Sequence, residues 1–167
     1  MHRTISPQFI VYLGMTLAAV AAQAAGTVQV SFVQPEQFAD VRDANQRSDD
    51  NLRELKGFLE ARAARHLGDG QALSIEILDV NLAGEIRYSR RLGRDVRVLR
   101  SGADWPRITL RYKLESPGQA PRSGEETVAD MSYLSHLPRY ADGDALRYEK
   151  HMLDDWLDAQ FGHAAAK

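Results

Sequence analysis

The segment from Arg107 to Glu115, RITLRYKLE, alternates strictly between polar and apolar side chains, and this alternation constrains the fold more than any other feature. A repeat of two residues is typical of a β-strand, because successive side chains point to opposite faces of the sheet. One face of this strand is therefore apolar and the other is polar. A chain with such a strand must cover one face of its sheet and leave the other in water.

Three other segments also have the composition of strands. Residues 27–33 (TVQVSFV) alternate cleanly and predict a half-buried strand. Residues 72–80 (ALSIEILDV) are rich in branched apolar side chains and predict a more central strand, with a bulge or two covered faces where the apolar phase shifts near Ile77. Residues 123–134 (SGEETVADMSYL) follow a short turn, so they are predicted to pair antiparallel with residues 107–115.

Two segments carry apolar side chains at the three- and four-residue steps that are typical of amphipathic helices. They are residues 48–67 and residues 146–161. These helices are the only predicted cover for the apolar face of the sheet. The sequence therefore predicts an α+β fold, in which two helices pack on one face of a mostly antiparallel sheet as an open-faced sandwich.

The first 24 residues have the pattern of a secretory signal peptide. His2 and Arg3 form a short positive end, an apolar run extends from Phe9 to Ala22, and Ala22-Gln23-Ala24 supplies a small-x-small cleavage pattern. As a helix this run spans about 21 Å, which is short of the hydrocarbon core of about 30 Å and argues against a membrane anchor. We therefore expect cleavage near Ala24, a periplasmic location, and a soluble single domain over residues 25–167.

The chain contains no cysteine. This excludes disulfides, thiolate metal sites and an N-terminal lipid on a cysteine. The charges nearly balance, with 21 Lys plus Arg against 23 Asp plus Glu, so the overall charge selects no partner. A mature chain of this length can bury a sufficient core without covalent support.

The segment from Leu146 to Phe161, LRYEKHMLDDWLDAQF, suggests either a metal or acid–base site or a helix that covers the sheet. A helical projection places its aromatic and aliphatic side chains on one broad arc. The opposite arc holds five polar residues: Arg147, His151, Asp154, Asp155 and Asp158. We interpret this arc as a solvated surface without a metal, because too few ligands converge there. An imidazole buried among acidic groups would instead favour a catalyst. His136, isolated in the sequence, is interpreted as a turn residue.

Glu149 is the exception, because it falls inside the apolar arc of this helix. A buried carboxylate requires a partner, so the simpler interpretation is a structural ion pair or hydrogen bond with the sheet. The alternative is a general acid with a raised pKa, acting with Asp79, Glu85 or Asp130 in a carboxylate-based site. Ordinary turn and capping roles are the competing interpretation for these last three residues.

Residues 84–100 are predicted to form a hairpin or a mobile loop, with Gly93 near its tip. This arm carries six arginines against one aspartate, Asp95. A hairpin projects most of them from one arm, where guanidinium groups can bind phosphate or carboxylate in bidentate fashion. The candidate binding residues are Arg87, Arg90, Arg91, Arg94, Arg97 and Arg100. The alternative is a solvated arm whose charge is offset by the acidic last helix. Few aromatic residues are interspersed, which argues against nucleic acid.

The chain contains no nucleophile elbow, phosphate loop, zinc-protease helix or dinucleotide glycine pattern. Five blocks in order instead resemble the bacterial domain-of-unknown-function family 3016: VQVSFVQPEQFADV, ILDVNLAGE, WPRITLRYKL, EETVADMSYL and LRYEKHMLDDWL. The resemblance implies a small exported protein, usually of one domain. It implies no cofactor and no catalytic residue.

The sequence thus leads to three hypotheses. The first is a non-enzymatic binding or accessory module of the cell envelope, which contacts an envelope protein or an anionic envelope component through the arginine-rich arm and needs no cofactor. The second is an envelope hydrolase around Glu149. The third is a purely structural homo-oligomer, since the sequence leaves the oligomeric state open.

Overall fold

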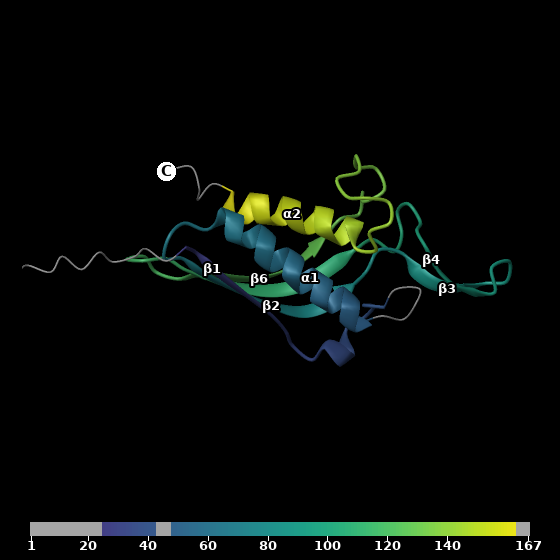
Figure 1. Ribbon diagram of the computed structural model, residues 1–167, viewed down its shortest axis with the longest axis horizontal. Helices are drawn as coiled ribbons and strands as arrows, with labels where there is room; N and C mark the ends of the chain where they lie inside the picture. Colours follow the sequence, from purple (N-terminus) through teal and green to yellow (C-terminus); the bar gives the residue numbers. More distant parts are fainter. Residues whose placement is uncertain (1–24, 43–47, 163–167) are drawn as a thin grey trace, which may run out of the picture.

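The computed structural model describes residues 25–42 and 48–162. The predicted signal peptide, residues 1–24, lies outside the described residues. Figure 1 shows a sheet covered by a layer of two helices, with a hairpin that extends from one end of the molecule. In this part of the chain, no helix is both long enough and apolar enough to cross a membrane.

The main sheet has the strand order β1-β2-β5-β6. Its strands are β1 (Thr27–Phe32), β2 (Ala72–Asn81), β5 (Arg107–Glu115) and β6 (Arg122–Ala129). The predicted antiparallel pairing of β5 with β6 is confirmed, and β2 also pairs antiparallel with β5. The predicted bulge is confirmed as well, because the register of β2 against β5 shifts between Ile77 and Asp79. β1 pairs with β2 in parallel, which makes the sheet mixed.

Both helices lie on the same face of this sheet (Figure 1). They are α1 (Ser48–Ala63), which continues into a short 3-10 turn (Ala64–His66), and α2 (Arg147–Phe161); a second 3-10 turn (Pro35–Gln37) follows β1. The alternating apolar residues of β5 are buried beneath them. The core joins Leu55 and Leu59 of α1, Leu153 and Leu157 of α2, and Ile75 and Leu110 of the sheet. The predicted α+β fold is therefore confirmed.

The opposite face of the sheet carries polar side chains that pair with one another. Arg111 donates to Glu76 on the neighbouring strand at 2.8 Å and lies 3.7 Å from Glu125 on the other side. Thr109 and Thr127 are hydrogen-bonded at 2.9 Å. This face can remain in water because its charges are matched across the strands.

The arm (residues 85–98) is an antiparallel hairpin of β3 (Glu85–Ser89) and β4 (Arg94–Val98), separate from the main sheet. Its turn is closed by the amides of Leu92 and Gly93, which both donate to the carbonyl of Ser89, at 3.2 and 2.8 Å. Gly93 has a φ of +64°, which suits glycine. Of the two interpretations left open by the sequence, a hairpin is the one observed.

One segment departs from the prediction. β6 ends at Ala129, so residues 130–134 are not part of the strand. They begin a long connection, the 130–146 loop, which lies beside the N-terminal part of α2 (Figure 1). The alternating pattern continues past Ala129, but the carboxylate of Asp130 accepts from the amide of Ser132 at 2.9 Å and begins a turn.

Candidate functional site

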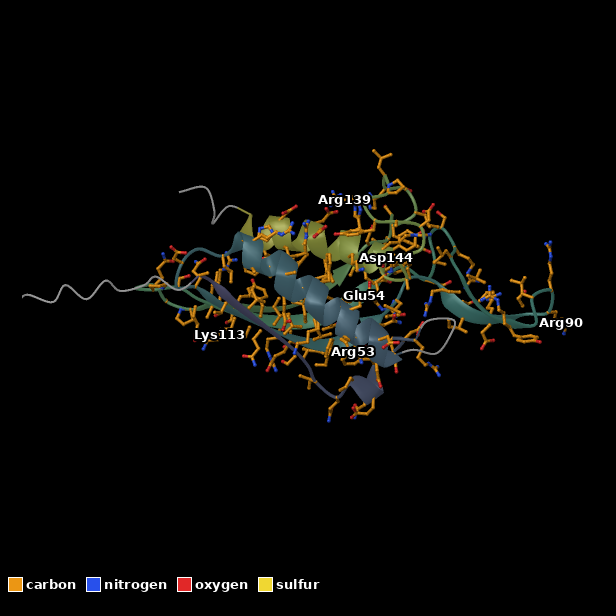
Figure 2. The ribbon with its side chains drawn as sticks, viewed as in Figure 1. Arg53, Glu54, Arg90, Lys113, Arg139 and Asp144 are labelled. Carbon is orange, nitrogen blue, oxygen red and sulfur yellow. The ribbon has the colours of Figure 1, made fainter. Side chains whose placement is uncertain are left out.

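The tip of the arm carries a cluster of exposed cationic side chains. Arg90 and Arg91 lie in the turn and Arg94 begins β4, and all three side chains are exposed. Figure 2 shows Arg90 at the far end of the arm, pointing away from the body of the molecule. Among the described residues, no carboxylate lies within ion-pair distance of these three arginines. Their guanidinium groups are therefore available to an external anion.

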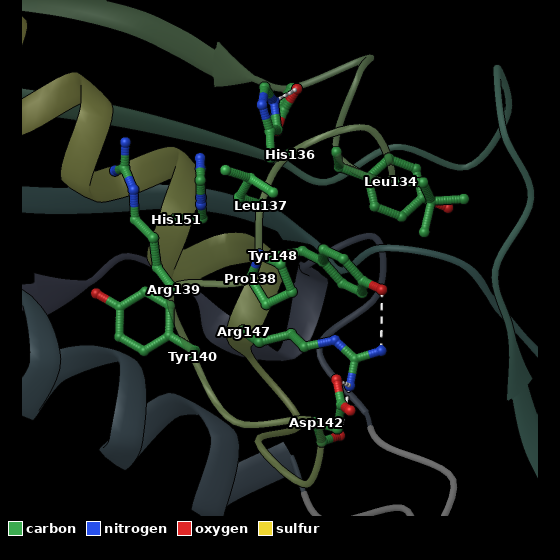
Figure 3. Close-up of a pocket in the computed structure, with 12 residues that line it drawn as sticks. Leu134, His136, Leu137, Pro138, Arg139, Tyr140, Asp142, Arg147, Tyr148 and His151 are labelled. Carbon is green, nitrogen blue, oxygen red and sulfur yellow. Dashed lines mark hydrogen bonds and ion pairs between the residues drawn. The ribbon is translucent and has the colours of Figure 1, made fainter.

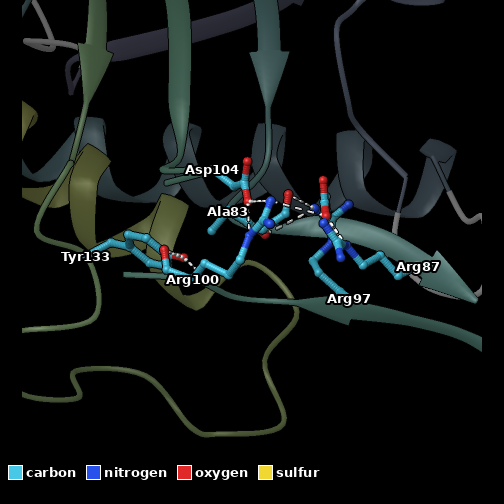
Figure 4. A network of polar contacts seen from close by, with 8 residues as sticks. Ala83, Arg87, Arg97, Arg100, Asp104 and Tyr133 are labelled. Atoms are coloured by element: carbon cyan, nitrogen blue, oxygen red, sulfur yellow. Dashed lines mark hydrogen bonds and ion pairs between the residues drawn. The ribbon is translucent and has the colours of Figure 1, made fainter. Parts of the chain in front are cut away.

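The other three predicted arginines are engaged at the base of the arm (Figure 4). Arg87 forms an ion pair with Glu85 on the same strand. Arg100 lies 3.2 Å from Glu85 and donates through Nε to Asp104 at 2.9 Å, and this hydrogen bond raises its pKa. Arg97 is largely buried. The structure thus divides the six arginines into a structural set at the base and an accessible set at the tip.

Arg97 holds the arm to the rest of the fold. Its NH1 donates to the carbonyls of Ala83 and Gly84, each at 3.0 Å, and its NH2 donates to the carboxylate of Asp40 at 3.0 Å and to the carbonyl of Arg42. Only a cation with several donors can satisfy these four acceptors at once. Arg97 is therefore a structural residue, unlike the arginines at the tip.

Glu149 reaches the same region from α2. Its side chain is 1% exposed, and Oε1 accepts a hydrogen bond from the amide of Ala83 at 2.7 Å. Oε2 has no partner among the described residues. Burial raises the pKa of Glu149, while the hydrogen bond from Ala83 and the charge of Arg97 oppose the increase. The structure therefore places Glu149 in a structural hydrogen bond that joins α2 to the connection between β2 and β3. Ala83 links Glu149 to Arg97, because its amide donates to Glu149 and its carbonyl accepts from Arg97.

This raised pKa makes the effect of Glu149→Gln depend on pH. Between the ordinary pKa near 4.5 and the higher folded value, the folded protein retains a proton that the unfolded chain releases. The stability contributed by Glu149 therefore falls as pH rises through this window. Glutamine accepts from Ala83 but does not titrate. We expect the unfolding free energy of Glu149→Gln minus that of the wild type to increase with pH.

Urea titrations of both proteins between about pH 4 and pH 8 measure this difference. The comparison cancels the contributions of the other carboxylates, which the two proteins share. Asp69→Asn is a suitable control, because Asp69 is exposed and lies outside this contact. A difference that stays constant over the pH range would contradict the assignment.

The other three carboxylates of the hypothetical acid site each bind a different group. Asp79 accepts from the amide of Ala39 at 2.8 Å. Glu85 is occupied by the arginines at the base of the arm. Asp130 contacts Nε2 of His136 at 3.0 Å. Asp130 lines a pocket, and among the described residues no hydrogen bond or ion pair joins the four carboxylates into one acidic site.

That pocket lies between the 130–146 loop and α2 and has a volume of about 140 Å³ (Figure 3). His136 of the loop stacks on His151 of α2, with ring centroids 4.7 Å apart and an interplanar angle of 18°. Nε2 of His151 lies 3.4 Å from Asp155. Each imidazole thus has its own carboxylate. The described residues contain no group of three or more His, Asp or Glu placed to hold a metal ion.

The solvated surface predicted for the outer arc of α2 is therefore wrong in part. His151 is 8% exposed and Asp154 is 4% exposed, whereas Asp155 and Asp158 are exposed as predicted. Asp154 accepts from Nε of Arg62 on α1 at 2.6 Å and from the hydroxyl of Tyr140 on the loop. The reason is that α1 and the 130–146 loop flank α2, so part of its polar arc faces protein rather than water.

The match to known families covers almost every element described above. Residues 26–159 match the family described as protein of unknown function (DUF3016). The chain belongs to the DUF3016 family. This confirms the resemblance drawn from the five sequence blocks. No curated protein matches the chain. The DUF3016 match includes both the arm and the 130–146 loop, so both belong to the domain itself.

Sequence reasoning missed one residue that shapes this region of the DUF3016 protein, Tyr133. Its hydroxyl donates to the carbonyl of Arg100 at 3.1 Å and accepts from the amide of the same residue at 3.1 Å. Its ring packs edge to face on Tyr148 of α2, with centroids 4.9 Å apart. Burial raises the pKa of Tyr133. Tyr133 therefore joins the 130–146 loop to the base of the arm. Tyr133 lies in a segment that was predicted as a strand, and nothing in the local sequence pattern indicated its contact with Arg100.

Proposed function

We propose that this DUF3016 protein is exported to the periplasm and acts there as a non-enzymatic binding or accessory module, contacting an anionic component of the cell envelope through the tip of the arm. The observation that carries the proposal is the contrast within the arm. Arginines at its base are paired with carboxylates and carbonyls. In the described chain, no carboxylate lies within ion-pair distance of Arg90, Arg91 or Arg94. Three unpaired guanidinium groups at the end of a projecting hairpin suit phosphate or carboxylate recognition.

The proposed location rests on the sequence. The apolar run and the small-x-small pattern that ends at Ala24 favour export and cleavage. Cleavage there leaves the first described strand intact, because β1 begins at Thr27. The chain has no cysteine for the usual N-terminal lipid, which supports attachment to the envelope by binding.

The test is reversal of the three tip charges in Arg90→Glu/Arg91→Glu/Arg94→Glu. A photocrosslinker placed at Ser89, the last residue of β3 before the turn, reports what the tip contacts in cells that export the protein. We expect the yield of crosslinked adducts to fall at least about tenfold, because each reversed charge converts attraction into repulsion. The melting temperature should hardly change, since exposed charges contribute little to stability.

The matched control reverses three exposed cations of α1 and of the 3-10 turn that follows it, in Arg53→Glu/Lys56→Glu/Arg65→Glu. This variant has the same net charge as the tip variant but an unchanged arm. It should give the wild-type adducts at the wild-type yield. Adducts that survive reversal of the tip charges would remove the proposal.

A second candidate function is acid–base hydrolysis in the pocket, which the burial of His151 beside Asp155 favours. His151 is thus buried among acidic groups, the arrangement that the sequence analysis took to favour a catalyst, but the pocket lacks other groups that hydrolysis would use. The lining includes no Ser, Thr or Cys that could act as a nucleophile, and the Nε2 atoms of both histidines already face carboxylates. Turnover of chromogenic esters or phosphodiesters that His136→Gln abolishes would decide for this function.

A further inference from the structure

Exposed large apolar side chains are concentrated on two projecting segments. Within the described residues, five of six such side chains lie on the arm or on the 130–146 loop, and the sixth is Val33 after β1. The five are Tyr88, Leu92, Met131, Leu134 and Leu137. Leu137 is 86% exposed and Tyr88 is 66% exposed. Folding gains nothing from this exposure, so a concentration of such side chains in one region indicates a contact surface.

The two segments project from the same end of the molecule. Figure 1 places the 130–146 loop beside the start of α2 and the arm beyond the end of the sheet, both at the right-hand end of the view. Tyr133 fixes their bases to each other through its two hydrogen bonds with the backbone of Arg100. The loop is also held by Lys150 of α2, whose Nζ lies 2.6 Å from Asp144. Both segments are therefore anchored at the same end of the fold and form one surface there.

The chemistry of this surface combines exposed apolar side chains with exposed arginines. Leu92 lies between Arg91 and Arg94 in the turn of the arm, and Tyr88 is close by on β3. The nearest acidic group in the sequence is Asp95, which is only half-exposed. Leucine and tyrosine insert readily at the boundary between lipid headgroups and acyl chains, and arginine binds headgroup phosphates beside them.

We propose that the tip of the arm and the 130–146 loop together dock on the surface of an anionic phospholipid bilayer. This inference rests on the proposed function and names its partner. The five apolar side chains are divided between the arm and the loop, where Leu134 and Leu137 line the pocket, so they do not form one continuous patch of the roughly 800 Å² per partner that a stable protein interface requires. A fluid bilayer surface accommodates both projections at once. Its negative charge complements the three tip arginines, each of which strengthens attachment roughly fivefold.

The test uses the protein that begins at Ala25, which contains every described element. Its co-sedimentation is measured with vesicles of phosphatidylethanolamine and phosphatidylglycerol, and with vesicles of phosphatidylcholine. We expect binding to the anionic vesicles, reduced at least about tenfold in Leu92→Ser/Leu137→Ser and in the tip charge reversal. The matched control is Val33→Ser, which changes the one exposed apolar side chain outside the surface and should bind as the wild type does.

The outcomes separate this inference from the proposed function. Binding that depends on the tip arginines but not on Leu92 and Leu137 is simple electrostatic adsorption and overturns the docking surface. Absence of vesicle binding, together with charge-dependent adducts from Ser89 to a protein, overturns the lipid partner but retains the binding module. If the protein neither binds vesicles nor forms charge-dependent adducts, the lipid partner and the binding module are both overturned. The substituted side chains are exposed, so unchanged melting temperatures will show that each variant is folded.

Discussion

Replacing Arg97 with methionine is expected to lower the free energy of unfolding by about 3 kcal/mol, because the substitution removes one partner of a largely buried ion pair. Asp40 loses its cation, and the carbonyls of Ala83, Gly84 and Arg42 lose their donor. Methionine fills much of the space but supplies no hydrogen bond. Urea unfolding of both proteins at one pH gives the difference.

Arg87→Met is the matched control, since it makes the same exchange in the same hairpin. Arg87 is more than half exposed and pairs only with Glu85, so its loss should cost less than about 1 kcal/mol. Adding Asp40→Asn to Arg97→Met should recover part of the loss, because the unpaired charge is then removed. If Arg97→Met costs no more than Arg87→Met, Arg97 is not the structural anchor of the arm.

The second large effect is expected at Gly84, just before the arm. Its φ is +79°, and an added Cβ would lie 2.5 Å from the carbonyl oxygen of Val98 and 2.8 Å from Cδ2 of Leu99. Gly84→Ala should therefore cost about 1–2 kcal/mol for the left-handed backbone and about 1–3 kcal/mol more for the displaced strand. The measurement is again the free energy of unfolding in urea.

Gly93→Ala separates the backbone cost of Gly84→Ala from the cost of displacing the strand. Gly93 has a similar positive φ of +64°, but an added Cβ would have no atom within 4 Å of it. Only the backbone cost applies there. The difference between the two variants therefore measures the close approach of Gly84 to β4. Equal losses in both variants would show that this approach contributes nothing.

The layers of the fold follow from short-range patterns in the sequence. The alternation in residues 107–115 placed Ile108, Leu110 and their neighbours on the covered face, and the structure confirms this burial. The steps of three and four residues in the last helix placed Trp156 and Leu157 in the core as well. These predictions succeed because a strand or helix fixes which side chains share a face, whatever lies elsewhere in the chain.

The surroundings of each face could not be predicted in the same way. His151 and Asp155 share the polar arc of α2, yet one is buried and the other exposed, because a loop from outside the helix covers only part of that arc. Arg97 and Arg94 are both arginines of one strand. They differ because Arg97 reaches Asp40, which lies 57 residues earlier in the chain. Such contacts depend on the tertiary fold, which no local periodicity encodes.

The parallel pairing of β1 with β2 imposes an order on folding. β5 and β6 are neighbours along the chain and can pair as soon as the turn between them forms. β1 pairs later, because the residue opposite Thr27 is Ala72, which follows α1 in the sequence. The earliest strand to be synthesised is thus among the last to find its place, at the margin of a sheet already assembled.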